Sequence, residues 1–215
     1  MTAMQHAVSQ TAWRAGLARV RGGVVVAFAF LLLAGCGERP ASEIALQPSE
    51  VGGARPCPNT GSFDHLLTVR GALADPNGAA DRDVWSSLKA AGAVDSYVQV
   101  YAGKGTDPAR CRYGISGGYG TGIDDVVVRF GSNREAHDAW ASGSLIGWRA
   151  PADTIRLYRP VTGSATGLGD DSVVFTGVDE LGVAYWARGA VVSLVEAQAD
   201  RLTTESLARH VDARM

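Results

Sequence analysis

The chain has 215 residues, of which 46% are hydrophobic and 20% are charged, and its formal net charge is −2. This length and composition fit one globular domain preceded by an export segment. Three of the 20 basic residues lie in the first 35 positions, which hold no acidic residue, so the remainder carries 17 basic against 22 acidic side chains. Because binding a phosphate backbone takes clustered Lys and Arg, we expect no nucleic-acid partner.

The N-terminal stretch has the three parts of a secretory signal in the required order. A positively charged region ends at Arg21, an apolar run follows over 24–33, and the small residues Ala34 and Gly35 precede Cys36. As a helix, the apolar run would extend about 15 Å, roughly half the hydrocarbon core of a bilayer. The run is therefore too short to span a membrane.

The tetrapeptide Leu33-Ala34-Gly35-Cys36 resembles the lipobox of bacterial lipoproteins. This resemblance implies a signal peptide over 1–35, cleavage before Cys36 and attachment of a diacylglyceryl group to the Cys36 thiol. Two or three acyl chains hold a protein durably on a bilayer. We therefore expect the membrane to be a partner through a lipid anchor, on the extracytoplasmic face of the cell membrane, or at the outer membrane if the cell is Gram-negative.

The two remaining cysteines suggest a disulfide. With Cys36 assigned to lipid, Cys57 and Cys111 are an even pair in an oxidising compartment, and we expect them to form a disulfide.

The segment after Cys36 suggests a tether. Residues 37–56 are short of large apolar side chains and rich in turn formers, so 36–56 is predicted to be the lipidated cysteine and a flexible tether. Twenty such residues have an r.m.s. reach of about 25 Å, enough to lift a single domain over 57–215 clear of the headgroups.

Hydrophobic periodicity gives the elements of that domain in chain order. Residues 57–79 fit a helix and a strand about equally, and Asp81 is a good N-cap for a helix over 82–91. Ser132 and Glu135 form a capping box that begins a helix ending at Gly143. Strands are predicted over 97–101, 110–115 and 123–130, near 154–158, and over 172–177, 181–188 and 190–197, before a last helix from about 203.

This order of elements predicts an α+β domain with a mostly antiparallel sheet and about three helices packed on one face. On the last helix, Leu207 and Val211 lie four residues apart, a spacing suitable for docking on the sheet. The layout, with the turn Gly167-Leu168-Gly169-Asp170 before paired strands, is similar to small lipoproteins of actinobacteria.

One motif suggests catalysis. Residues 114–118 match G-x-S-x-G, the nucleophile elbow of serine hydrolases, and His210 follows in the hydrolase order. The elbow needs a helix directly after the serine, whereas Ser116 is followed by a glycine-rich run that disfavours a helix. We therefore expect a loop here and no catalytic residue, with a small envelope hydrolase using Ser116 as the alternative.

Other polar and aromatic clusters have structural explanations. Asp75, Asn77, Asp81 and Asp83 offer calcium-type oxygens but miss the usual loop spacing, and Asp124 and Asp125 are interpreted as strand-edge residues. The histidines lack metal-ligand spacing, so no metal or other cofactor is expected. Tyr and Trp side chains could line a groove, although core packing is the usual role. The sequence favours a non-catalytic domain that binds a small ligand or an envelope protein, with a purely structural component as a further alternative.

Overall fold

The computed structural model describes residues 39–215 with the exception of 73–77, 103–121, 150, 178–180 and 200. Seven described strands form one antiparallel sheet in the order β1-β2-β3-β7-β6-β5-β4. Their bounds are β1 Arg55–Pro56, β2 Ala93–Ala102, β3 Gly122–Phe130, β4 Val161–Thr162, β5 Ser172–Thr176, β6 Leu181–Arg188 and β7 Val191–Gln198. The expected α+β class and mostly antiparallel sheet are confirmed.

The centre of the sheet is the long-range pairing of β3 with β7. In this ladder Ile123 lies opposite Ala197, and Val127 opposite Ser193. Five consecutive residues of β3 and seven of β7 are buried. Strands buried on both faces have near-continuous apolar sequences rather than alternating ones, which indicates that both faces of the sheet are covered.

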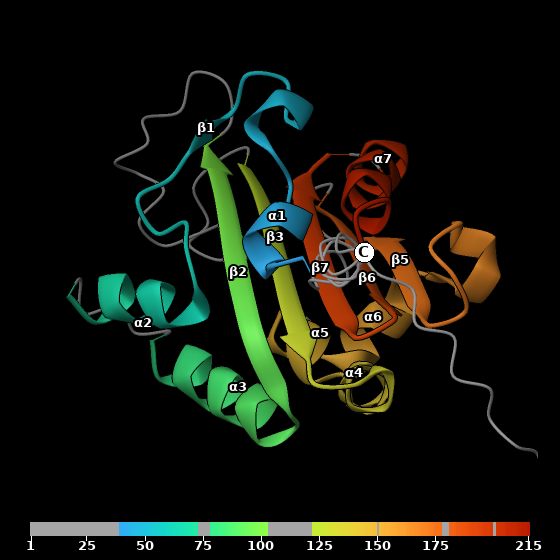
Figure 1. Ribbon diagram of the computed structural model, residues 1–215. Coiled ribbons are helices and arrows are strands. Elements are labelled where there is room, and N and C mark those ends of the chain that lie inside the picture. The colour runs from blue at the N-terminus through green and yellow to red at the C-terminus, as the bar shows by residue number, and fades with distance from the viewer. Residues whose placement is uncertain (1–38, 73–77, 103–121, 150, 178–180, 200) are drawn as a thin grey trace, which may run out of the picture. The chain divides into compact units, whose positions relative to one another are not determined.

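Helices cover both faces, so the prediction of about three helices on one face is wrong (Figure 1). The first face carries α2 Phe63–Ala72, α3 Gly78–Ala90, α4 Asn133–Ser142, α5 Ser144–Arg149 and α6 Ala152–Leu157. The second face carries α1 Ala41–Ile44 and α7 Arg201–Asp212, with the short 3₁₀ helix η1 Pro48–Glu50 after α1 and a second one, η4 Gly163–Thr166, after β4. Each face has its own apolar core, and we use the names first face and second face for these two sides.

Several local predictions are confirmed. The Ser132 hydroxyl accepts a hydrogen bond from the Glu135 amide at 3.2 Å, and α4 ends at Gly143, which has φ +67°. That left-handed conformation is the one that favours glycine at a helix end. Leu207 and Val211 are both buried against the second face, as their spacing on α7 predicts.

Two local predictions are wrong. Residues 152–157 form helix α6 where a strand was expected near 154–158. The Ile155 amide bonds to the Pro151 carbonyl at 3.1 Å, and Asp153 lies in the first turn, where an acid is favoured by the helix dipole. Helix α3 begins at Gly78, so Asp81 lies inside it and is not an N-cap. The strand expected over 110–115 lies outside the described residues.

The predicted tether is wrong for residues 41–51, which pack on the second face and which we call the N-terminal strap. Ala41, Ile44, Ala45 and Leu46 are at most 2% exposed, and the compact unit begins at Arg39. The sequence suggested a tether because large side chains are scarce. Small side chains, however, allow the backbone to lie close to the sheet, where side chains of the domain bind its polar groups.

Four hydrogen bonds to the rest of the domain hold the backbone of strap residues 44–46. The Leu46 amide donates to Asp125 Oδ2 at 2.7 Å, and the Tyr101 hydroxyl donates to the Leu46 carbonyl at 2.9 Å. Arg214, beyond α7, donates to the carbonyls of Ile44 at 2.9 Å and Ala45 at 3.0 Å. The strap is thus bound by β2, by β3 and by the end of the chain after α7.

Candidate functional site

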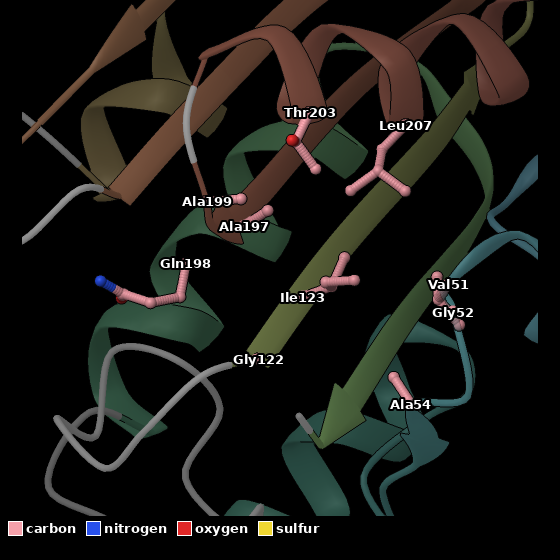
Figure 2. Close-up of a pocket in the computed structure, with 10 residues that line it drawn as sticks. All are labelled: Val51, Gly52, Ala54, Gly122, Ile123, Ala197, Gln198, Ala199, Thr203 and Leu207. Carbon is pink, nitrogen blue, oxygen red and sulfur yellow. The ribbon is translucent and has the colours of Figure 1, made fainter. Parts of the chain in front are cut away.

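A pocket of about 170 Å³ lies on the second face, where β3 begins and β7 ends (Figure 2). The turn after the N-terminal strap forms one wall and the first two turns of α7 form the other. The described residues that line it are Val51, Gly52, Ala54, Gly122, Ile123, Ala197, Gln198, Ala199, Thr203 and Leu207.

Local sequence explains why space is left here. Ile123 and Ala197 are opposite each other in the β3–β7 ladder, and the small side chain of Ala197 leaves a hollow beside Ile123. Thr203 and Leu207 are four residues apart, so both lie on the same side of α7. Gly52 has φ +60°, a left-handed conformation that allows the chain to turn at the rim.

The described side chains that line the pocket are mostly apolar, and only those of Thr203 and Gln198 carry polar groups. Figure 2 shows Thr203 and Leu207 above Ile123, whereas the side chain of Gln198 points away from them. None of the described lining residues has a titratable side chain. Such a surface can bind an aliphatic group.

A buried carboxyl lies close by, two residues after Ile123 on the same strand face. Asp125 is fully buried, and burial raises its pKa to about 7. Two hydrogen bonds that Asp125 accepts lower this pKa, one from the Leu46 amide and one from the Ser193 hydroxyl, whose oxygen is 3.3 Å from Asp125 Oδ1. Burial and the negative charge of Asp125 also raise the pKa of the Tyr101 hydroxyl well above its ordinary value. These groups hold the strap rather than line the pocket.

The interpretation of Asp124 and Asp125 as strand-edge residues is wrong, because β3 is a central strand. Asp124 is 1% exposed and lies directly opposite Glu196 of β7, which is 3% exposed. Both side chains belong to the first face, because they share the parity of the residues that pack there. Sequence reasoning missed this juxtaposition because nothing local indicates that β3 pairs with β7.

Most sequence-predicted site residues lie outside the described part of the chain. Cys36, Cys111 and Ser116 are among them, so lipidation, the disulfide and the hydrolase alternative stay predictions. Cys57 is 4% exposed in the first-face core, and its amide bonds to the Val100 carbonyl at 2.8 Å. His210 contacts Glu50 of the strap, with Nδ1 3.6 Å from Oε1.

The acidic cluster that offers calcium-type oxygens, for which the sequence favoured a structural role, is only partly described. Asp81 is fully buried and pairs with Arg70 of α2 at 2.8 Å, while Asp83 is exposed and Asp75 and Asn77 lie outside the described residues. Over the described ranges, no three His, Cys, Asp or Glu side chains converge as metal ligands would. Asp81 therefore joins two helices by a buried ion pair.

The aromatic side chains that are described pack in the cores and do not line the pocket. Tyr185 and Trp186 are buried on opposite faces of β6, and Trp85 stacks on Phe63 with ring centroids 5.2 Å apart. Tyr101 is 1% exposed beneath the strap. Core packing, the role favoured by the sequence, is thus what these described aromatic residues have, and other side chains line the pocket.

The pocket residues were missed by sequence reasoning because they are small and chemically ordinary. The available signal was the run of small residues at strand ends and turns, Gly52 and Gly53, Gly122, and Ala197 and Ala199.

In the described part of the chain, no helix is both long enough and apolar enough to cross a bilayer. No protein-family model matches the chain and no curated protein matches it either, so its function is argued from the pocket and the groups around it.

Proposed function

We propose that this chain is a lipid-anchored protein on the extracytoplasmic face of a cell membrane, and that it binds a ligand or an envelope partner without catalysing a reaction. The lipobox at Cys36, with its charged and apolar flanks, supports the location. The single observation that carries the binding role is the aliphatic pocket between the strap and α7.

The size of the pocket limits what it can hold. Pockets that take drug-sized ligands have volumes of about 300–1,000 Å³, whereas a cavity of about 150 Å³ accommodates benzene. At about 170 Å³ the pocket fits a short alkyl chain or one apolar side chain of a partner.

The binding role is tested with 1-hexanol as a probe, by saturation-transfer NMR on the purified chain. Ala54 lies in the pocket wall, so Ala54→Leu fills part of the space and should lower the transfer to the alkyl protons. The matched control is Ala80→Leu, the same change at an exposed position of α3 on the first face. Equal transfer to the wild type and to Ala54→Leu would show that the pocket does not bind the probe.

The location is tested separately with Cys36→Ser. Loss of the thiol should abolish incorporation of radioactive palmitate and should release the protein from the membrane fraction or leave unprocessed precursor. Normal labelling and normal fractionation of the variant would rule out Cys36 as the anchor. Within the described residues, no contact favours the serine hydrolase or the purely structural alternative over binding.

A further inference from the structure

The position at which the folded unit begins bears on how the domain meets the membrane. Arg39 is already in contact with the domain, its guanidinium donating to the Arg214 carbonyl at 3.1 Å. Ala41 is fully buried, and its amide donates to Asp95 Oδ2 at 2.7 Å. In the described part of the chain the first buried residue thus follows Cys36 by five positions, where the sequence suggested a tether of about twenty residues.

Chain length then limits the distance between anchor and domain. Five residues span at most about 17 Å when fully extended. A domain of this length has a radius of gyration of about 16 Å. A tether whose full extension is about equal to this radius of gyration keeps the side of the domain from which it starts close to the lipid.

We propose that the side of the second face formed by α1 and the C-terminal end of α7 is a membrane-facing surface that rests on the lipid headgroups. This inference depends on the proposed lipidation of Cys36, because that modification places the anchor directly before the strap. The opposite side, with α3 and α4 on the first face, then points away from the bilayer and is presented to the envelope.

The strap cannot lengthen the tether without losing the contacts that hold it. Arg214 binds two strap carbonyls and also donates to Glu50 Oε2 at 3.0 Å. The Leu46 amide is held by the buried Asp125. These bonds connect the strap to elements from both halves of the domain, so release of the strap would expose buried polar groups together.

The chemistry of the surface suits zwitterionic headgroups. Arg39 and Glu43 are exposed with opposite charges, and Arg214 is neutralised by Glu50. Such a surface has no excess of basic residues that would select anionic lipids. The contact is therefore set by the short tether, and it should depend little on ionic strength.

The test uses the lipidated full-length protein in phosphatidylcholine vesicles that contain a headgroup-labelled acceptor lipid. A coumarin-bearing amino acid replaces either Ser42, exposed on α1, or Ser87, exposed on α3. Energy transfer should be greater from position 42 than from position 87, in low and in high salt alike. Inserting roughly 20 Gly and Ser residues between Glu38 and Arg39, with a reach of about 25 Å, should lower the transfer at position 42 and abolish the difference.

Flotation of the vesicles shows whether a negative result contradicts the membrane-facing surface or the lipid anchor at Cys36. If the protein floats with the vesicles but the two positions transfer equally, or the insertion changes nothing, the membrane-facing surface is refuted while the anchor stands. If the wild-type protein does not float, the proposed anchor itself is wrong and the inference falls with it.

Discussion

Replacing Asp125 with asparagine tests how the buried carboxyl couples strap docking to pH. Burial raises its pKa from the ordinary 3.8 to about 7 in the folded protein. Between these two values the folded state keeps a proton that the unfolded chain releases, so stability falls as pH rises. The favourable contribution is complete below pH 3.8 and is lost as pH rises through about 7.

The size of the effect follows from the same two values. One pKa unit is worth about 1.4 kcal/mol, so the full difference corresponds to about 4 kcal/mol. Between pH 5 and pH 8 the wild-type protein should lose roughly 2–3 kcal/mol through this group. Asparagine cannot ionise, and its carbonyl oxygen can still accept the Leu46 amide. The free energy of unfolding of Asp125→Asn should therefore gain roughly 2–3 kcal/mol relative to the wild type over that range.

The measurement is urea unfolding at pH 5, 6, 7 and 8, on proteins that also carry Cys36→Ser so that no lipid is attached. Asp83→Asn, the same change at an exposed position of α3, is the control and should leave the pH profile unchanged. A difference between wild type and Asp125→Asn that stays constant across these pH values would refute the reasoning.

Three further outcomes are expected. Asp81→Asn removes the anionic partner of the buried Arg70 and should lower the free energy of unfolding in urea by about 3–5 kcal/mol. The double variant Arg70→Met, Asp81→Leu should recover most of that loss. A loss below about 1 kcal/mol for Asp81→Asn would contradict a stabilising role of the ion pair. Mass spectrometry of unreduced tryptic peptides should find Cys57 linked to Cys111, and free thiols at both positions would disprove the pairing. Ser116 should not react with a fluorophosphonate, and stoichiometric labelling there would revive the hydrolase alternative.

The sequence predicted correctly those elements whose ends are marked by local signals such as capping residues and glycines. The hydroxyl of Ser132 and the glycine at position 143 mark both ends of α4, and β5, β6 and β7 begin and end close to their predicted bounds. Propensity failed at 154–158, where Thr, Ile and Tyr favour a strand by composition. Pro151 instead caps the start of helix α6. Strand propensity takes no account of such a helix-start signal.

Features that depend on long-range pairing could not be predicted. The local sequence around Asp125 indicates an edge residue, and only the pairing of β3 with β7, which places Val195 opposite Asp125, shows that its strand is central. The strap is a similar case, because Ala41 and Ala45 carry little hydrophobic signal and are buried by contacts with distant residues. The pocket depends on both the β3–β7 pairing and the docking of the strap. Its walls come from the turn after the strap, from the β3–β7 ladder and from α7.

The bonds from Arg214 to Ile44 and Ala45 have a consequence for the order in which this protein is assembled. Because synthesis proceeds from the N-terminus, the strap is made first and its guanidinium partner about 170 residues later. At the 5–20 residues per second of synthesis, that interval is on the order of ten seconds or more. During it the strap has no completed binding site, so we expect it to stay open to proteases and chaperones and to dock late in folding.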